Sequence, residues 1–346
     1  MKTFYRFLCY KLKSSALRTL SFTVVAILID LIGIVGCVAN TDPKFNKSGL
    51  YMLATILCVV ASVVPIFELA GLKNRRNLDT LYSFPIERNK MALVYYVSGF
   101  AQVMLIYTAT FLVHYIYYVV QTDCFALVYM LPYYLLSLLL ALVIYSVYVF
   151  VFTQANTVVD GVVLCALWIF FLWAVSNVVL DFLFYTRMMT YNKIWLASSW
   201  GILYTPMNNL TVLYQDLIEI NRPESWDGSV KQIMEHFYLF FGWGAAGIAA
   251  VVGYFTSFAK KGAEKAGELS NSWFGYRTLL PIYGCCLLYT LGPDWIHILP
   301  YAIVMITGYV IYRRGFKFKL SDGIVTVIGT VIPFLMSFMI YLIRTA

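Results

Sequence analysis

Nine apolar blocks, most of them about 20 residues or longer, follow one another along this chain and are separated by short charged stretches. The hydrocarbon core of a bilayer is about 30 Å thick, and a helix needs about 20 apolar residues to cross it. Hydrophobic residues make up 61% of the chain and charged residues only 12%, which leaves too little polar surface to cover a water-soluble globule. The sequence therefore predicts an all-α polytopic membrane protein and excludes a soluble enzyme.

The expected spans are set by length and by the turn residues between them. They are Leu20–Ala39, Leu50–Leu72, Met91–Val120, Phe125–Phe152, Gly161–Phe184, Phe237–Phe258, Thr278–Leu291, Trp295–Tyr312 and Gly323–Ile343. The seventh and eighth are short, and Gly292-Pro293-Asp294 between them is a turn signal, so they form either a full hairpin or a shallow re-entrant pair. Either arrangement returns the chain to the same side of the membrane.

The basic residues indicate the orientation. With the N-terminus in the cytoplasm, 18 of the 25 Lys and Arg residues fall on the cytoplasmic side. Cytoplasmic loops of membrane proteins carry such an excess. The sequence therefore predicts a multi-pass protein of the cell membrane with a cytoplasmic N-terminus. Loops that face anionic lipid account for the net charge of +8, so nucleic acid is not expected as a partner.

The first 15 residues form an amphipathic pattern. Phe4, Phe7, Leu8 and Leu12 recur at helical spacing, and basic residues fill other positions. This pattern predicts a helix that lies on the cytoplasmic membrane surface. The alternative is a disordered basic tail.

The cytoplasmic loop 73–90 contains a second helical pattern. Leu78, Leu81 and Tyr82 sit at i, i+3 and i+4, and Pro85 ends the pattern. A helix of fewer than three turns is not stable alone in water, so it must pack on a partner. That partner is either the membrane domain of the same chain or a cytoplasmic protein.

Two segments resemble a known transporter family. The run Leu78-Asp79-x-x-Tyr82-Ser83-Phe84-Pro85-Ile86-x-Arg88, directly before a span, resembles the coupling-helix stretch of ABC exporter permeases of the type-2 class. The run Lys261-Gly262-Ala263-Glu264-Lys265-Ala266-Gly267 resembles a segment of the Gram-positive acetoin-utilisation and bacitracin-type exporter permeases. Phe84 stands where leucine is usual, and Lys261 stands where arginine is usual.

The resemblance implies roles for particular residues. It implies that a separate ABC ATPase subunit is contacted by Leu78, Asp79, Leu81, Tyr82, Phe84 and Pro85, with a second cytoplasmic contact at Glu264, Lys265 and Gly267. It also implies a second permease subunit and a hydrophobic or amphipathic substrate such as a peptide, an antimicrobial or a lipid-like compound. ATP and Mg²⁺ would belong to the partner ATPase, and this chain would need no cofactor and no enzymatic activity of its own.

The same resemblance suggests a domain organisation. Residues 1–18 are the interfacial helix, and 19–258 are a six-span permease core with the coupling loop 73–90 and the external segment 185–236. Residues 259–346 are a basic cytoplasmic loop followed by about three additional C-terminal spans. Within the external segment, Thr205 and Pro206 open an amphipathic helix. This helix is either a lid or partner surface, or it closes the outer end of its own bundle.

Catalytic and metal signatures are missing from the sequence. It contains no G-x-x-x-x-G-K-[ST], so the chain has no P-loop with which to bind the phosphates of ATP. Neither HExxH nor GxSxG occurs, and three unclustered histidines predict no metal site. Two other classes stay open: a secondary transporter, which would show repeated halves, and, less favoured, an integral membrane enzyme that uses Asp30 and His114.

Asp30 is the clearest intramembrane polar candidate, because it lies about halfway along the first expected span. Three interpretations of Asp30 stay open. It contacts substrate, it pairs with a polar residue across a permease dimer, or its carboxyl group is hydrogen bonded to a Ser, Thr or Tyr of a neighbouring helix. Glu68 lies at a span end, where contact with interfacial water is the simpler explanation, and its place one turn before Lys73 also allows a pair with the basic loop. His114 has no metal-ligating neighbour three or four residues away, which favours a hydrogen-bonded core histidine.

Overall fold

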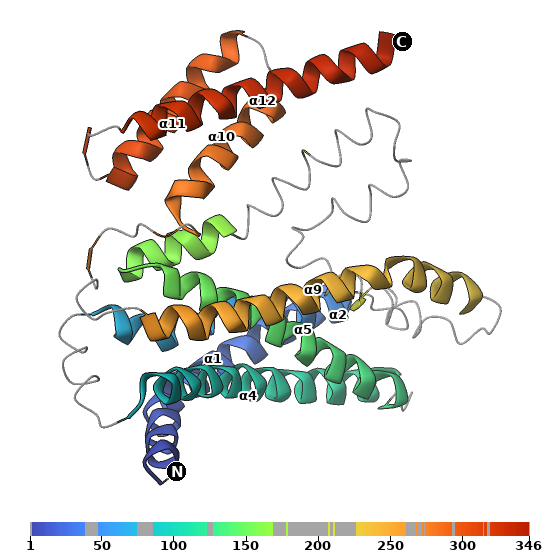
Figure 1. Ribbon diagram of the computed structural model, residues 1–346. Helices are drawn as coiled ribbons and strands as arrows, with labels where there is room; N and C mark the ends of the chain where they lie inside the picture. Colours follow the sequence, from blue (N-terminus) through green and yellow to red (C-terminus); the bar gives the residue numbers. More distant parts are fainter. Residues whose placement is uncertain are drawn as a thin grey trace. The chain divides into compact units, whose positions relative to one another are not determined.

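The computed structural model describes residues 2–38, 48–74, 86–122, 127–168, 226–260, 276–292, 295–313 and 319–345, with short pieces at 178, 207, 210–211, 267–268, 272, 274–275 and 315–316. Its long helices are α1 (Lys2–Val38), α2 (Ser48–Ala70), α4 (Arg88–Thr122), α5 (Leu127–Gln154), α9 (Trp226–Lys260), α10 (Tyr276–Leu291), α11 (Trp295–Arg313) and α12 (Leu320–Thr345). A single 3-10 turn, η2 (Gly71–Lys73), follows α2, and a further apolar helix covers Val158–Trp168. Figure 1 shows these helices, and no strand occurs among the described residues.

Seven of the described helices are long and apolar enough to cross a membrane: α1, α2, α4, α5, α9, α11 and α12. The chain is therefore an all-α, multi-pass membrane protein, as the sequence predicts. Of the two other expected spans, the seventh corresponds to α10, which has only 16 residues. The fifth begins as the helix Val158–Trp168, and the rest of it lies outside the described residues.

The chain divides into two compact units. Unit 1 contains Met1–Thr153 and Pro206–Glu264, and unit 2 contains Gln154–Thr205 and Lys265–Ala346. Unit 1 therefore holds α1, α2, α4, nearly all of α5, and α9, whereas unit 2 holds the helix Val158–Trp168 together with α10, α11 and α12.

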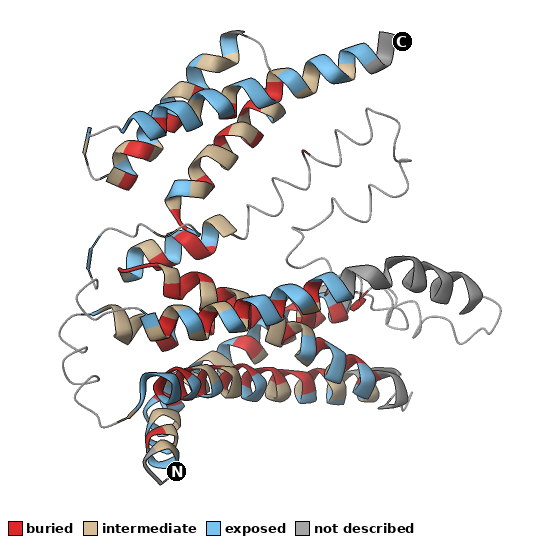
Figure 2. Cartoon of the chain, in the orientation of Figure 1, coloured by how far each residue is buried: buried red, intermediate tan, exposed pale blue. Residues whose placement is uncertain are grey.

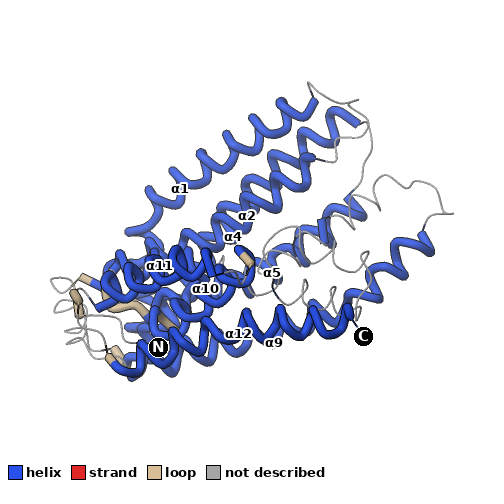
Figure 3. Tube along the Cα trace, turned by 90° about the horizontal axis from the view of Figure 1, so that it is seen from above, coloured by secondary structure: helices blue, strands red, loops and turns tan. Residues whose placement is uncertain are grey.

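In unit 1, helices α1, α2 and α4 pack on one another (Figure 3). Buried tyrosines of the neighbouring helices donate hydrogen bonds to the backbone of α4: Tyr145 of α5 to the Tyr96 carbonyl and Tyr254 of α9 to the Ala92 carbonyl, both at 2.9 Å. A buried hydroxyl needs such a partner in an apolar interior. These bonds hold α5 and α9 against α4.

Helix α1 runs without a break from Lys2 to Val38, where the sequence predicts a surface helix separate from the first span. No Gly or Pro lies between residues 2 and 32, so nothing in the sequence stops the helix at the membrane surface. Its N-terminal part packs on unit 1 rather than lying free. Phe7 is buried with its ring 6.3 Å from that of Tyr95, and Nζ of Lys11 lies 4.4 Å from the centroid of the Tyr95 ring.

Basic side chains gather at one end of unit 1. Two backbone contacts bring the helix ends together there: Nζ of Lys73 donates to the carbonyl of Thr153 at 3.4 Å, and Arg88 donates to the carbonyl of Ala259 at 3.4 Å. This basic end carries Arg6, Lys11, Lys13 and Arg18 of α1, Lys73 of η2, Arg88 and Lys90 of α4, and Lys260 of α9. Helices α1 and α4 therefore start at the basic end, and α2, α5 and α9 finish there.

The described part of the external segment packs on its own bundle. Met207, Leu210 and Thr211 are buried, and Oγ1 of Thr211 lies 3.3 Å from the hydroxyl of the buried Tyr133 in α5. These contacts favour the interpretation in which the segment closes its own bundle. Thr205 and Pro206 lie outside the described residues.

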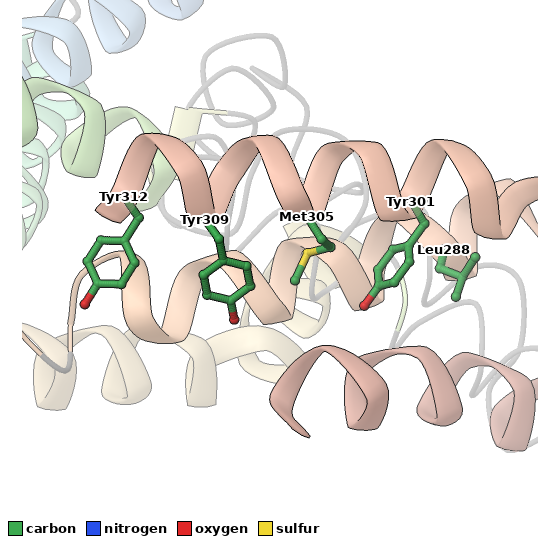
Figure 4. Packing of buried hydrophobic residues seen from close by; sticks show 5 residues of the cluster. All are labelled: Leu288, Tyr301, Met305, Tyr309 and Tyr312. Atoms are coloured by element: carbon green, nitrogen blue, oxygen red, sulfur yellow. The ribbon is translucent and has the colours of Figure 1, made fainter. Parts of the chain in front are cut away.

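In unit 2, α10, α11 and α12 enclose a cluster formed by Leu288, Tyr301, Met305, Tyr309 and Tyr312. Figure 4 shows the last four in a row along one face of α11, as expected for positions three or four residues apart. Arg313 binds Asp322 with two hydrogen bonds from Nη2, of 2.8 and 2.9 Å, across the connection to α12. Helix α10 ends at Gly292, whose φ of +86° suits glycine, as the predicted turn requires.

Exposed residues recur along several helices (Figure 2), and many of them are large and apolar. On α12, Val327, Ile328, Val331, Leu335 and Phe338 are all exposed. A water-soluble protein rarely exposes an apolar surface of this extent, whereas lipid tails solvate it. These faces therefore agree with the membrane location of the helices.

Candidate functional site

A buried cluster of charged and polar side chains lies at the C-terminal end of α2, centred on Glu68, which is 1% exposed. Arg18 of α1 donates to Oε2 of Glu68 and, at 2.9 Å, to Oε1 of Gln102. Nζ of Lys11 lies 3.5 Å from Oε1 of Glu68. From α4, Ser98 donates to Oε1 at 3.1 Å and Gln102 donates to Oε2 at 3.0 Å. We call these five residues the Glu68 cluster.

The Glu68 cluster ties three helices together at the basic end. A buried carboxylate is tolerated only when cations and hydrogen bonds replace the water that it loses. Here two cations come from α1 and two neutral donors come from α4, and Arg18 also donates to the carbonyl of Phe67 in α2 at 3.2 Å. The charge network therefore fixes the ends of α2 and α4 against α1.

The partners of Glu68 differ from the expected one. The sequence suggests contact with interfacial water or a pair with the basic loop that begins at Lys73, but Glu68 is buried away from the surface. Lys73 instead directs its ammonium group to the carbonyl of Thr153 and lies 5.5 Å from the centroid of the Phe152 ring. The Glu68 side chain faces α1 and α4. It is therefore paired with Lys11 and Arg18, which are distant in sequence, and not with Lys73.

A second polar contact joins α1 and α4 further along the bundle. Asp30 is completely buried and His114 is 4% exposed. Nδ1 of His114 lies 3.1 and 3.2 Å from the two carboxylate oxygens of Asp30. The sequence offers a Ser, Thr or Tyr of a neighbouring helix as the bonding partner of Asp30, and the structure provides a histidine instead.

The Arg18–Gln102 and Asp30–His114 contacts join α1 and α4 with the same offset in sequence. Arg18 and Gln102 are 84 residues apart, and so are Asp30 and His114. Helices α1 and α4 therefore run in parallel, and residues four apart on one helix meet residues four apart on the other. The buried Ala26 and Thr110 occupy the level next to the Asp30–His114 pair. The α1–α4 contact is thus polar at two levels, 12 residues apart.

No catalytic group is assembled around the Asp30–His114 pair in the part of the chain that the structure describes. Neither side chain is hydrogen bonded to a serine, threonine or cysteine there that the imidazole could activate. Across the same ranges, no three His, Cys, Asp or Glu side chains are grouped so that they could hold a metal ion. The pair is a buried hydrogen-bonded contact between two helices, and it holds no hydroxyl or thiol nucleophile among the described residues.

The residues of the coupling motif lie outside the described residues: Leu78, Asp79, Leu81, Tyr82, Phe84 and Pro85. The structure describes the two flanks of this loop, which are fixed at the basic end by Lys73 and Arg88. Of the second predicted contact, Glu264 and Lys265 are also outside. Gly267 is described within unit 2, where its backbone N–H donates to the carbonyl of Asn156 at 3.0 Å and its φ of +84° favours glycine.

No protein-family model matches this sequence, and a search of curated proteins finds no match.

Proposed function

We propose that the chain is the transmembrane permease subunit of an ABC exporter, which moves a hydrophobic or amphipathic substrate with ATP hydrolysed by a separate subunit. One observation carries the proposal. The loop that contains the coupling motif connects α2 to α4 at the basic end, and both of its flanks are bonded to the ends of other helices, α5 and α9. A force on this loop would therefore reach four helices of unit 1.

The Glu68 cluster extends this coupling to α1. Because Glu68 and Gln102 sit on the helices that flank the loop and both bind Arg18, displacement of α2 or α4 requires movement of α1 or loss of the cluster. We infer a rocking movement: two ATPase subunits close on ATP, press on the loops of two permease subunits, and open a path outward or laterally. The buried tyrosines of unit 1 suit an amphipathic substrate.

ATP and Mg²⁺ belong to the partner ATPase in this proposal, because the sequence has no P-loop. We expect the purified chain, produced in a host without its partner, to hydrolyse no ATP. The same chain purified from its native membrane should retain a P-loop ATPase, identified by mass spectrometry, and recombining the two proteins should restore hydrolysis. Hydrolysis by the chain alone, with the host's own ATPases excluded, would contradict the proposal.

The proposed orientation places the basic end in the cytoplasm of the cell, with the N-terminus inside. Single cysteines at Arg75, Lys261 and Arg314, in a variant that lacks the seven native cysteines, should resist membrane-impermeant thiol reagents in intact cells. A cysteine at Lys193 should react under the same conditions and serves as the positive control. External labelling of position 75 would reverse the orientation.

A further inference from the structure

Asp30, Glu68 and Asp322 are the carboxylates that are buried among the described residues. They differ in the basic side chains that they bind. Glu68 has two cations beside it, and Asp322 has Arg313. Arginine stays charged at every physiological pH. Asp30 has His114 alone, and histidine is the side chain whose charge changes between pH 5 and 8. Asp30 is thus the one of these three carboxylates whose partner is a histidine and not an arginine or lysine.

Within the described parts of α1, α2 and α4, the Asp30–His114 pair lies far along the helices from other charged residues. Arg18, the nearest charged residue toward the start of α1, is 12 residues away, which is about 18 Å along a helix. Helices α1 and α4, which carry the pair, pack on each other and on α2. The other charged residues of these three helices are Lys2, Arg6, Lys11, Lys13 and Arg18 of α1, Glu68 of α2, and Arg88 and Lys90 of α4. At the level of the pair, the helices also carry titratable residues that are neutral at ordinary pH. These are Cys37 of α1, Tyr51 and Cys58 of α2, and Tyr107, Tyr115, Tyr117 and Tyr118 of α4.

We propose that Asp30 and His114 form a proton-binding site whose occupancy holds α1 against α4. With one bound proton the pair carries no net charge, whether the proton resides on the imidazole or on the carboxyl group. Without it, a carboxylate beside a neutral imidazole leaves one negative charge buried among apolar side chains. Such a charge is strongly unfavourable in a membrane interior. Loss of the proton therefore weakens the contact between the two helices at this level.

The two polar levels of the α1–α4 contact then respond differently to pH. The Arg18–Glu68 level keeps its charges, so the helices stay joined at the basic end. The Asp30–His114 level loosens as pH rises, and α1 becomes free to separate from α4 toward the opposite end of unit 1. The ligand of this site is a proton, and the site needs neither ATP nor a partner subunit to bind it.

The test is thermal unfolding of the purified full chain in detergent at about pH 6 and about pH 8.5, which lie on either side of the ordinary histidine range. We expect the midpoint of the wild-type protein to be at least roughly 2–4 °C lower at the higher pH. In His114→Gln this drop should change in size, because Asp30 is then the one member of the pair that can take up the proton. In Asp30→Asn it should disappear or reverse, because no carboxylate is left without a partner and protonation of His114 becomes unfavourable.

His297→Gln is the matched control, since Nδ1 of His297 lies 2.9 Å from the carbonyl of Gly292 and is bonded to no carboxylate among the described residues. It should keep the wild-type drop. The proposal is overturned if His114→Gln and His297→Gln behave alike. If His114→Gln does not fold, Asp30→Asn decides alone, and a wild-type drop in that variant overturns the proposal. Because the measurement involves no ATPase and no transport, its result is independent of the proposed export function.

Discussion

Replacing Arg18 with methionine is expected to lower the free energy of unfolding by about 3 kcal/mol, the lower end of the range for breaking a buried ion pair. The substitution leaves Glu68 buried without its closest cation. It also removes the hydrogen bond that Arg18 donates to Oε1 of Gln102. The loss is not larger because Lys11 remains 3.5 Å from the carboxylate and Arg18 itself is 28% exposed. Chemical or thermal unfolding of the purified chain in detergent measures the change.

The matched control is Lys13→Met, which removes an exposed cation from the same stretch of α1. An exposed substitution away from such contacts usually changes stability by less than about 0.5 kcal/mol. Combining Arg18→Met with Glu68→Gln should recover part of the loss, because the buried carboxylate is removed together with its closest cation and only the partly exposed Lys11 loses its partner. If Arg18→Met is as mild as Lys13→Met, the cluster does not contribute to stability as the geometry indicates.

The sequence is sufficient to predict the helical spans, because length and apolar composition alone decide whether a helix crosses a bilayer. It also predicts the turn after α10, since Gly292-Pro293-Asp294 is a local signal. These features depend only on residues close together in the chain. The continuous helix α1 is harder to predict, because its amphipathic N-terminal part and its apolar part have different patterns and suggest two separate helices. The one sequence feature that indicates a single helix is the lack of Gly or Pro between the two parts.

The polar contacts between helices could not be predicted in the same way. Asp30 and His114 are 84 residues apart, and spacing rules for a helix reveal neighbours only three or four positions away. The pairing becomes visible once α1 and α4 are known to be parallel neighbours, because Arg18 and Gln102 then give the same offset. Knowledge of the helix packing, rather than of any motif, therefore turns two isolated intramembrane residues into a site.

The coupling assignment rests on sequence, and its sharpest test is the double substitution Leu81→Ala with Tyr82→Ala. We expect it to abolish co-purification of the ATPase or to uncouple ATP hydrolysis from transport. Truncating a buried anchor at a protein interface typically weakens binding by about 1–3 kcal/mol, so each substitution should lower the affinity by roughly 5- to 150-fold. Expression and thermal stability of the permease should stay near those of the wild type, because a loop outside the bilayer contributes nothing to span recognition.

The matched control is Asn89→Ala, an exposed position in the first turn of α4, just beyond the motif. It should leave both the ATPase complex and the coupling of hydrolysis to transport unchanged. A double variant that misfolds would show that the predicted loop helix packs on the permease itself. A double variant that folds, retains the ATPase and transports normally would contradict the coupling assignment and favour a secondary transporter, for which the Asp30–His114 pair would be the first proton site to examine.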